Sequence, residues 1–259
     1  MKKALIVLEK EWLELRLQRG LLLATLFLPP LMTLFAVVGF FAIGRISAAS
    51  IPQGGPLPPE FASLSPREIG QAIVGRQFSI LFLLLPIFIP SVLASYAIVG
   101  EKRERTLEPV LATPIRTWEL LLGKILAALI PALAITIASA TVFVVGILAF
   151  AVTDRVRDVI VTPGWILAVL VDTPLLALIG VALIVVLSSR VNDPRTAQQF
   201  SAVLVVPVLA LLFGQLAGVI VLGPGLALGI GVVLAAIAAG AVWFATRLFQ
   251  REVILTRWR

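Results

Sequence analysis

The sequence predicts an all-α membrane protein in which an N-terminal amphipathic interfacial helix precedes six transmembrane helices. Composition is the first reason: 60% of the 259 residues are hydrophobic and 14% are charged. Soluble domains carry about 45–50% apolar and about 25% charged residues. The second reason is that long charge-free runs recur along the chain. So few charges cannot cover a water-exposed surface, and most of the surface is therefore expected to face lipid.

The charge-free runs are long enough for transmembrane helices, which need about 20 apolar residues to cross about 30 Å of hydrocarbon. The fifth and sixth spans share one uncharged stretch, residues 196–246, which the turn signal Gly223-Pro224-Gly225 divides. We therefore treat residues 1–259 as one transmembrane domain. Its six spans are expected at about 21–44, 73–99, 124–151, 164–189, 200–222 and 226–247.

Lysine and arginine are distributed unequally between the two sides of these spans. Sixteen lie in the N-terminal segment, in the loops after spans two and four, and at the C-terminus, whereas five lie on the other side. Cytoplasmic loops carry the excess of basic residues in membrane proteins. Both termini are therefore expected in the cytoplasm, and an even number of spans independently requires them to share a side.

Short motifs mark where several spans begin. Ser65-Pro66-Arg67-Glu68 has the form of a capping box with proline at the first helical position. Thr162-Pro163 and Asp193-Pro194 precede spans four and five in the same way. Prolines inside a span predict kinks, because proline cannot donate the helical hydrogen bond and its ring displaces a carbonyl. These prolines are Pro86, Pro90, Pro131, Pro174 and Pro207.

Residues 1–19 form the expected interfacial helix. Leu5, Leu8, Trp12 and Leu15 recur at helical spacing and define one apolar face, and Trp12 suits the headgroup zone. Such a helix lies on the cytoplasmic membrane surface before it turns into the first span. The alternative is a water-exposed extension of that span. The polar residues that lie away from the face are Lys10, Glu11, Glu14 and Gln18.

The chain has no cysteine and no histidine, which excludes several kinds of chemistry. Disulfides, thiolate or imidazole metal sites, and Ser-His or Cys-His nucleophile pairs cannot form. We expect no catalytic residue and no metal site. An intramembrane enzyme would need such groups, or clustered acids within the spans, so that class is the least supported. The net charge of +7 indicates membrane topology and lipid headgroup contact rather than nucleic-acid binding.

The most informative segment is the cytoplasmic loop between spans two and three, residues 100–123. It begins with alternating charges, continues with a short amphipathic stretch at 107–111, and restarts a helix at Thr113-Pro114. A charged helix–break–helix on the cytoplasmic face suits the docking of a soluble partner. A solvated loop that follows the positive-inside rule explains the same residues equally well.

This segment resembles the corresponding part of ABC-2 type permeases, the membrane subunits of a large family of bacterial and archaeal ABC transporters that are mostly exporters. The resemblance rests on Thr106-Leu107-Glu108, on Thr113-Pro114, and on Gly123-Lys124 at the entrance to the third span. Glu9-Lys10-Glu11 is also similar to the family's surface helix. One departure is Arg105, which stands where the family usually has glycine before Thr-Leu-Glu.

The resemblance implies a permease in a prokaryotic plasma membrane that pairs with a second permease subunit, as a homodimer or heterodimer, and docks on a separate ABC ATP-binding subunit. That partner would bind ATP and Mg²⁺, and this chain would hold no cofactor. Its sequence lacks a phosphate-binding loop, because Ile125 follows Gly123-Lys124 and Trp118 occupies the place of the first glycine. The residues that would couple the spans to the ATPase are Glu101, Arg105, Thr106, Leu107, Glu108, Leu111, Thr113, Pro114 and Lys124.

Asp172 is the only charged residue within the fourth span. An intramembrane carboxylate is a candidate site for a cation or a proton, and Arg76 near the outer end of span two is its candidate partner. Asp172 could instead cap or brace the kink at Thr173-Pro174. The other polar groups in the spans are weak, which favours a hydrophobic or amphipathic substrate. The alternative to an ABC permease is a stand-alone ion-coupled carrier or channel, which usually has several intramembrane charges.

Overall fold

The structure, a computed structural model, describes residues 2–17, 19–46, 61, 63–101, 113, 115–187, 191, 193–217, 219–220 and 222–248. All regular elements within these residues are helices, which confirms the predicted all-α class. Six of the helical stretches are long and apolar enough to cross a membrane, which confirms the predicted number of spans. They comprise Thr25–Arg45, Pro66–Gly100, Thr117–Phe150, Pro163–Leu187, Pro194–Gln215 and Pro224–Arg247.

Several of these stretches are built from more than one helical element. The α-helices are α1 (Lys2–Leu17), α2 (Arg19–Arg45), α3 (Pro66–Leu81), α4 (Leu85–Ser95), α7 (Thr117–Phe150), α8 (Asp154–Ile160), α9 (Pro163–Leu167), α10 (Thr173–Leu187), α11 (Pro194–Ser201), α12 (Val205–Leu216) and α13 (Pro224–Leu248). Two 3₁₀ turns, η3 (Phe82–Leu84) and η6 (Ala202–Leu204), and two π-helical turns, η4 (Tyr96–Gly100) and η5 (Ala168–Asp172), join some of them.

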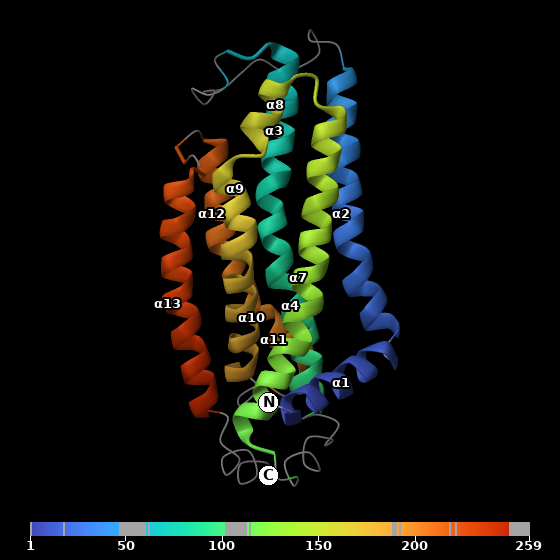
Figure 1. The fold of residues 1–259 in the computed structure, drawn as a ribbon, viewed down its shortest axis with the longest axis vertical. Coiled ribbons are helices and arrows are strands. Elements are labelled where there is room, and N and C mark those ends of the chain that lie inside the picture. Colours follow the sequence, from blue (N-terminus) through green and yellow to red (C-terminus); the bar gives the residue numbers. More distant parts are fainter. Residues whose placement is uncertain are drawn as a thin grey trace.

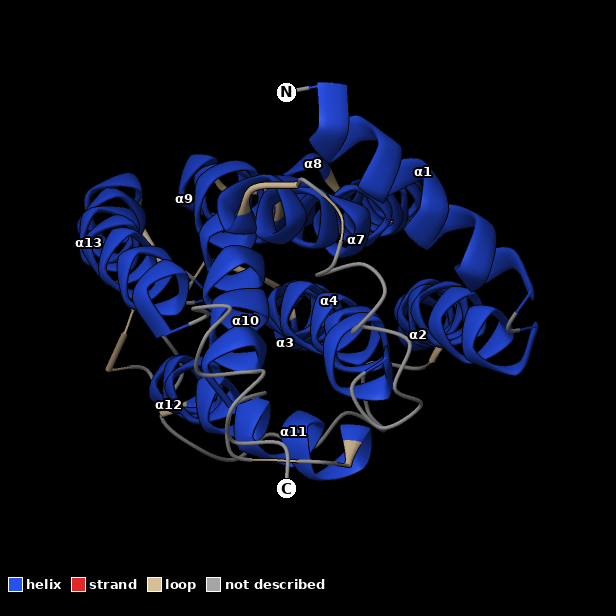
Figure 2. Cartoon of the chain, turned by 90° about the horizontal axis from the view of Figure 1, so that it is seen from below, coloured by secondary structure: helices blue, strands red, loops and turns tan. Residues whose placement is uncertain are grey.

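The second span, from α3 to η4, runs through the middle of the bundle (Figure 2). It is largely buried, and α2, α7, α10 and α12 contact it. By contrast, α2 and α13 lie at opposite edges of the bundle, and they and α12 expose large apolar side chains along most of their length (Figure 2). Helix α1 lies across one end of the bundle instead of running along it (Figure 1). Apolar side chains on the outside of such helices suit contact with lipid.

Three prolines coincide with the turns that interrupt the spans. Proline removes one helical N–H and its ring clashes with the carbonyl four residues earlier. Pro86 follows the 3₁₀ turn η3, Pro174 follows the π-helical turn η5, and Pro207 follows the 3₁₀ turn η6. In each case the residue four positions before the proline lies within the turn. Three of the five predicted kink sites therefore coincide with a change of helix type, whereas Pro90 and Pro131 lie within continuous α-helix.

The predicted helix starts at spans two, four and five are confirmed. The amide of Ser65 donates to the Glu68 carboxylate at 2.7 Å, as a capping box requires. Thr162 accepts from the amide of Trp165 at 3.2 Å, and Asp193 accepts from the amide of Thr196 at 3.0 Å. Each cap satisfies an amide group that has no partner within its helix.

The start of the third span differs from the expectation. We expected the helix to restart at Thr113-Pro114, but α7 begins at Thr117. Arg116 has extended backbone, and its amide donates to the carboxylate of Glu119 at 3.1 Å. A glutamate three residues into a helix commonly accepts from the residue before it in this way. This cap fixes the helix start a few residues later than the proline signal indicated.

The end of the bundle remote from α1 is held by one buried side chain. The Gln71 amide nitrogen donates to the carbonyl oxygens of Phe40 and Phe150, each at 3.1 Å. Its oxygen accepts from the amide of Val152 at 2.9 Å. Gln71 lies on α3, so it joins the ends of α2 and α7 to the central span, and it pairs the Phe150 carbonyl and the Val152 amide, which the end of α7 leaves without a helical partner.

We expect Gln71→Ala to destabilise the protein, because the Phe150 carbonyl and the Val152 amide lose their partner. Each such group costs roughly 1–3 kcal/mol, so a total loss of about 2 kcal/mol is a conservative expectation. The thermal unfolding midpoint in detergent should fall by about 4 °C or more. Gln77→Ala, at an exposed position of the same helix, is the control and should leave the midpoint unchanged. Equal midpoints for the two variants would contradict the role given to Gln71.

Candidate functional site

The structure describes three of the predicted coupling residues, Glu101, Thr113 and Lys124. Glu101 ends the second span and Lys124 lies two turns into α7, so these two residues flank the coupling segment on either side. The other predicted coupling residues lie outside the described part of the chain; they are Arg105, Thr106, Leu107, Glu108, Leu111 and Pro114.

Lys124 is the centre of a buried ionic cluster. Its ammonium lies 2.7 Å from Glu101 Oε2 and 2.6 Å from Glu11 Oε1 on α1. It also donates to the carbonyl oxygen of Ala97 at 2.6 Å, within the π-helical turn η4. The exposed fractions of Lys124, Glu11 and Glu101 are 1%, 3% and 6%. One side chain therefore joins α1, the end of the second span and the beginning of the third.

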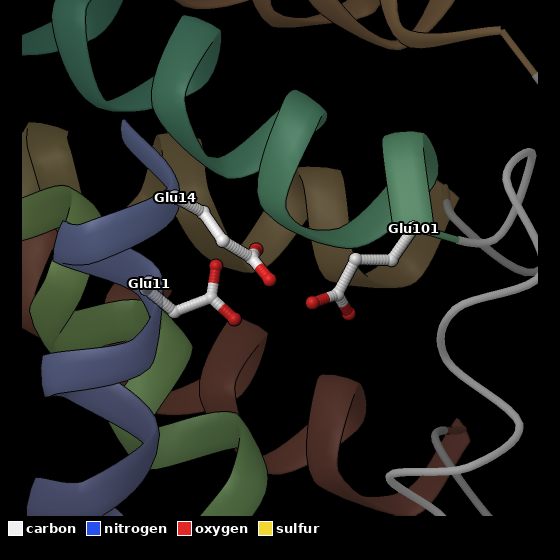
Figure 3. Close-up of side chains that lie close together, drawn as sticks. All are labelled: Glu11, Glu14 and Glu101. Carbon is white, nitrogen blue, oxygen red and sulfur yellow. The ribbon is translucent and has the colours of Figure 1, made fainter. Parts of the chain in front are cut away.

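Lys10 extends the cluster toward its exposed side. Its ammonium contacts Glu101 Oε1, Glu14 Oε1 at 2.9 Å and Glu11 Oε1 at 3.4 Å. Figure 3 shows the three carboxylates facing one another, two from α1 and one from the end of the second span. We call Lys10, Glu11, Glu14, Glu101 and Lys124 the interfacial ion cluster. It places three acids against two lysines.

Three acids share two lysines in this cluster, and the two buried acids, Glu11 and Glu101, differ in the direction of their pKa shift. Burial raises the pKa of Glu11, and the positive charge of Lys124 only partly opposes this effect. Burial acts in the same direction on Glu101, but Lys124 and Lys10 outweigh it and lower the pKa of Glu101. Burial would lower the pKa of Lys10, yet its acidic neighbours raise it. Glu101 is therefore the acid that the cluster holds ionised, and Glu11 is the first to accept a proton.

The three carboxylates could be suspected of binding a metal ion, because one oxygen of each lies within 4.8 Å of the others. The ammonium groups of Lys10 and Lys124 already lie among these oxygens. They supply the positive charge that such a carboxylate group otherwise takes from a cation. The arrangement is therefore that of a structural ion cluster.

Close packing of α1 on α7 brings the cluster together. A side chain at Gly123 would place its Cβ 2.7 Å from the carbonyl oxygen of Ala4 and 2.7 Å from Val7 Cβ, so only glycine permits this approach. Trp12 also donates to the carbonyl of Ala127 at 3.3 Å. Proline at position 131 has no amide to donate to that carbonyl, and the indole replaces it. The pair Gly123-Lys124 thus combines a close contact with a charge that reaches across it.

The buried face of α1 differs from the predicted face. Leu8 is buried and Leu15 packs against the core, as the apolar spacing indicates, but Leu5 is 56% exposed. Glu11, which the sequence pattern placed on the polar side, lies on the buried face with Ala4 and Val7. The interaction with Lys124 accounts for this rotation, because a buried ammonium needs an acidic partner.

A groove lies between α1 and the residues that precede α7. Its volume is about 360 Å³ and its walls are mostly apolar. Thr113 lines it, so the structure brings this residue of the coupling segment beside the interfacial ion cluster. The other lining residues are Lys3, Ile6, Val7, Lys10, Glu11, Ile115, Leu120 and Lys124.

Sequence reasoning did not identify Lys10, Glu11 and Glu14 as part of the site. A usable signal was present, because Lys124 lies two turns into the helix of the third span and has no acid three or four positions away on that helix. A lysine in such a position needs a partner from another element. Its nearest acidic partner, Glu11, lies 113 positions away along the chain.

Asp172 and Arg76 do not form the expected pair. Asp172 lies at the end of the π-helical turn η5, is 3% exposed, and contacts α13 beside Gly231. The guanidinium of Arg76 lies over the ring of Phe61 at 5.6 Å. No ion pair between described residues joins Arg76 to Asp172. The π-helical turn directs Asp172 toward the sixth span instead of the second.

We expect the two buried acids to respond differently to neutralisation. Glu101→Gln should lower the free energy of unfolding by about 3 kcal/mol at neutral pH, because removing one member of a buried ion pair leaves the other unpaired. Glu11→Gln should cost less, since glutamine resembles the protonated acid that burial favours at that position. Thermal unfolding in detergent measures both, and a larger loss for Glu11→Gln would contradict the assignment.

The pH dependence follows from the lowered pKa of Glu101. An acid whose pKa is lower in the folded state contributes stability above its unfolded pKa and loses it as the pH falls. The stability difference between the wild-type protein and Glu101→Gln should therefore shrink below about pH 4. A difference that stays constant from neutral to acidic pH would contradict an ionised Glu101.

Comparison with known proteins identifies the family. The sequence model described as ABC-2 family transporter protein matches residues 5–231, which is most of the chain. No curated protein sequence matches. The matched region contains most of α1, the interfacial ion cluster and all of the first five spans. This agrees with the resemblance seen in the coupling segment, and with six apolar helices the chain is a multi-pass membrane protein. The chain therefore belongs to the ABC-2 family of transporter proteins and is an ABC transporter permease.

Proposed function

We propose that this permease is the membrane-spanning subunit of an exporter that is driven by ATP hydrolysis in a separate ABC ATP-binding subunit. The observation that carries the proposal is the position of the interfacial ion cluster. Glu101 and Lys124 are the residues at which the coupling segment leaves one span and enters the next, and they share one ion pair. A displacement of the coupling segment would therefore be transmitted to two spans and to α1 together.

The proposed ATPase contact is the cytoplasmic segment 100–123. Its charged residues and short amphipathic stretch suit a protein surface, and the groove beside Thr113 offers apolar area next to it. ATP and Mg²⁺ belong to the partner in this proposal, since the sequence has no phosphate-binding loop. A second permease subunit, identical or different, would complete the transporter.

Orientation follows from the charges. The excess of lysine and arginine lies at the end of the bundle that carries α1, so we place this end and both chain termini in the cytoplasm of a prokaryotic cell. Helix α1 would rest at the inner headgroup layer. Its exposed side combines apolar residues, such as Leu13 and Leu17, with Lys2, Lys3 and Arg16, a combination that favours anionic lipid surfaces.

An amphipathic substrate is favoured by a groove between the second and fifth spans. The groove has a volume of about 490 Å³, within the range of small-molecule sites. Ile87, Phe88 and Val92 give it apolar walls, whereas Arg195 and Gln198 supply polar groups at its α11 side. A molecule with an apolar body and a polar, acidic head would match both. This groove is therefore the proposed contact for the exported molecule.

A stand-alone ion-coupled carrier is the second candidate, and the buried carboxyl of Asp172 is the observation that favours it. The two candidates differ in their energy source. Purified protein in lipid vesicles that transports without ATP or an ATP-binding subunit would support the carrier. Transport that requires both would support the permease.

The coupling segment can be tested by charge reversal. Glu108→Lys should reduce stimulation of the partner ATPase at least about 5-fold, since a charge-assisted contact contributes about 1–3 kcal/mol, while the amount of protein inserted into the membrane stays unchanged. Asp158→Lys is the matched control, because it reverses an exposed acid in α8 at the opposite end of the bundle. Unchanged ATPase stimulation in Glu108→Lys would argue against this segment as the docking site.

The proposed orientation can be tested with single cysteines, because the chain contains none. Thr113→Cys lies on the proposed cytoplasmic side and Asp158→Cys on the opposite side, and both positions are exposed. A membrane-impermeant maleimide should label Asp158→Cys in intact cells, and it should label Thr113→Cys only after the cells are opened. The reverse pattern would contradict the charge-based orientation.

A further inference from the structure

Asp172 lies deep within the fourth span. It is nine residues from the first residue of the span, Pro163, and fifteen from the last, Leu187. At 1.5 Å per residue these separations are about 14 Å and about 22 Å. The side chain is 3% exposed, and its Oδ1 has no hydrogen-bond partner. The carboxyl is therefore surrounded by the protein within the apolar layer.

The position opposite Asp172 has no side chain. A Cβ at Gly231 of α13 would lie 3.0 Å from Asp172 Oδ1, so glycine leaves just enough space for the carboxyl oxygen. The neighbouring Thr173 hydroxyl donates to the carbonyl of Val169. That hydroxyl is thus directed to the backbone. The carboxyl oxygen faces Gly231 in the backbone of α13. An aliphatic surface of this kind offers no hydrogen-bond donor, so it cannot stabilise a negative charge.

No opposite charge lies nearby in the described residues. The elements that pack most closely against η5 are η3, α9, α10 and α13. Their only charged residue is Arg247, sixteen positions from Gly231 along α13, or about 24 Å. An ionised carboxyl without a cation or hydrogen-bond donors is strongly disfavoured in such surroundings, and a protonated one is not.

We propose that Asp172 is a proton-binding site within the fourth span, whose carboxyl is protonated while α13 lies against it. This inference is independent of the proposed ATPase coupling, because it concerns spans four and six and not the interfacial ion cluster. The proton removes the charge that would otherwise require water or a metal cation beside Gly231. Release of the proton would require water to enter between α10 and α13.

Carbodiimide labelling tests the proposal on the wild-type protein. A lipophilic carbodiimide reacts only with a protonated carboxyl: the acid oxygen bonds to the central carbon, and the proton goes to a nitrogen. Rearrangement to the N-acylurea loses no atom, so the peptide gains the mass of one reagent molecule. We expect mass spectrometry to find this adduct on Asp172 in lipid vesicles at about pH 6. Sodium chloride should leave the extent of labelling unchanged.

Two outcomes would overturn the proposal. Absence of the adduct on Asp172 at about pH 6 would mean that the carboxyl is ionised, and protection by sodium ions would mean that it binds a metal cation instead. Asp172→Asn is the matched control: it should lose the adduct and keep the thermal midpoint within about 2 °C of wild type, because asparagine has the same size and no charge. A large fall in that midpoint would also contradict a neutral carboxyl.

Discussion

The buried charge of Lys124 is the constraint on which the α1 end of the molecule depends. An ammonium with 1% exposure is tolerated only if carboxylates and a backbone carbonyl surround it. Glu11 must therefore face α7, and Glu101 must lie at the end of the second span. These demands fix the rotation of α1 and the crossing point at Gly123. They also bring the two ends of the coupling segment together, so one interaction sets the geometry of the proposed ATPase contact.

Non-α turns position two of the buried acids that lie outside α1, Glu101 and Asp172. Glu101 follows the π-helical turn η4, and Asp172 ends the π-helical turn η5. A π-helical turn shifts the register of the following residues and frees backbone carbonyls, one of which, from Ala97, accepts from Lys124. At the remote end of the bundle, Gln71 contacts backbone groups of α2 and of the end of α7. The central span is thus fixed at both ends by polar contacts, while apolar packing dominates between them.

The fold class and the number of spans could be predicted because both depend on local quantities. Runs without charge reflect the thickness of the bilayer, and caps such as Ser65–Glu68 act within one helical turn. The interfacial ion cluster could not be predicted in full, since it joins residues 113 positions apart. The α1 sequence contains two overlapping faces at helical spacing, and only the partner at Lys124 decides between them. Asp172 is a similar case, because its depth in the fourth span could be predicted from the sequence. Its contact with Gly231 could not be predicted, since these two residues are far apart along the chain.

The central claim is that the Lys124 charge holds α1 onto the bundle, and hydrogen–deuterium exchange of α1 measures this directly. In the wild-type protein the amides of Lys2–Leu17 should be protected. In Lys124→Met they should exchange faster, because Glu11 and Glu101 lose their shared partner and repel each other, while α10 remains protected. Arg16→Met, at an exposed position of α1, should behave as wild type. Equal protection of α1 in Lys124→Met and in the wild-type protein would contradict the account.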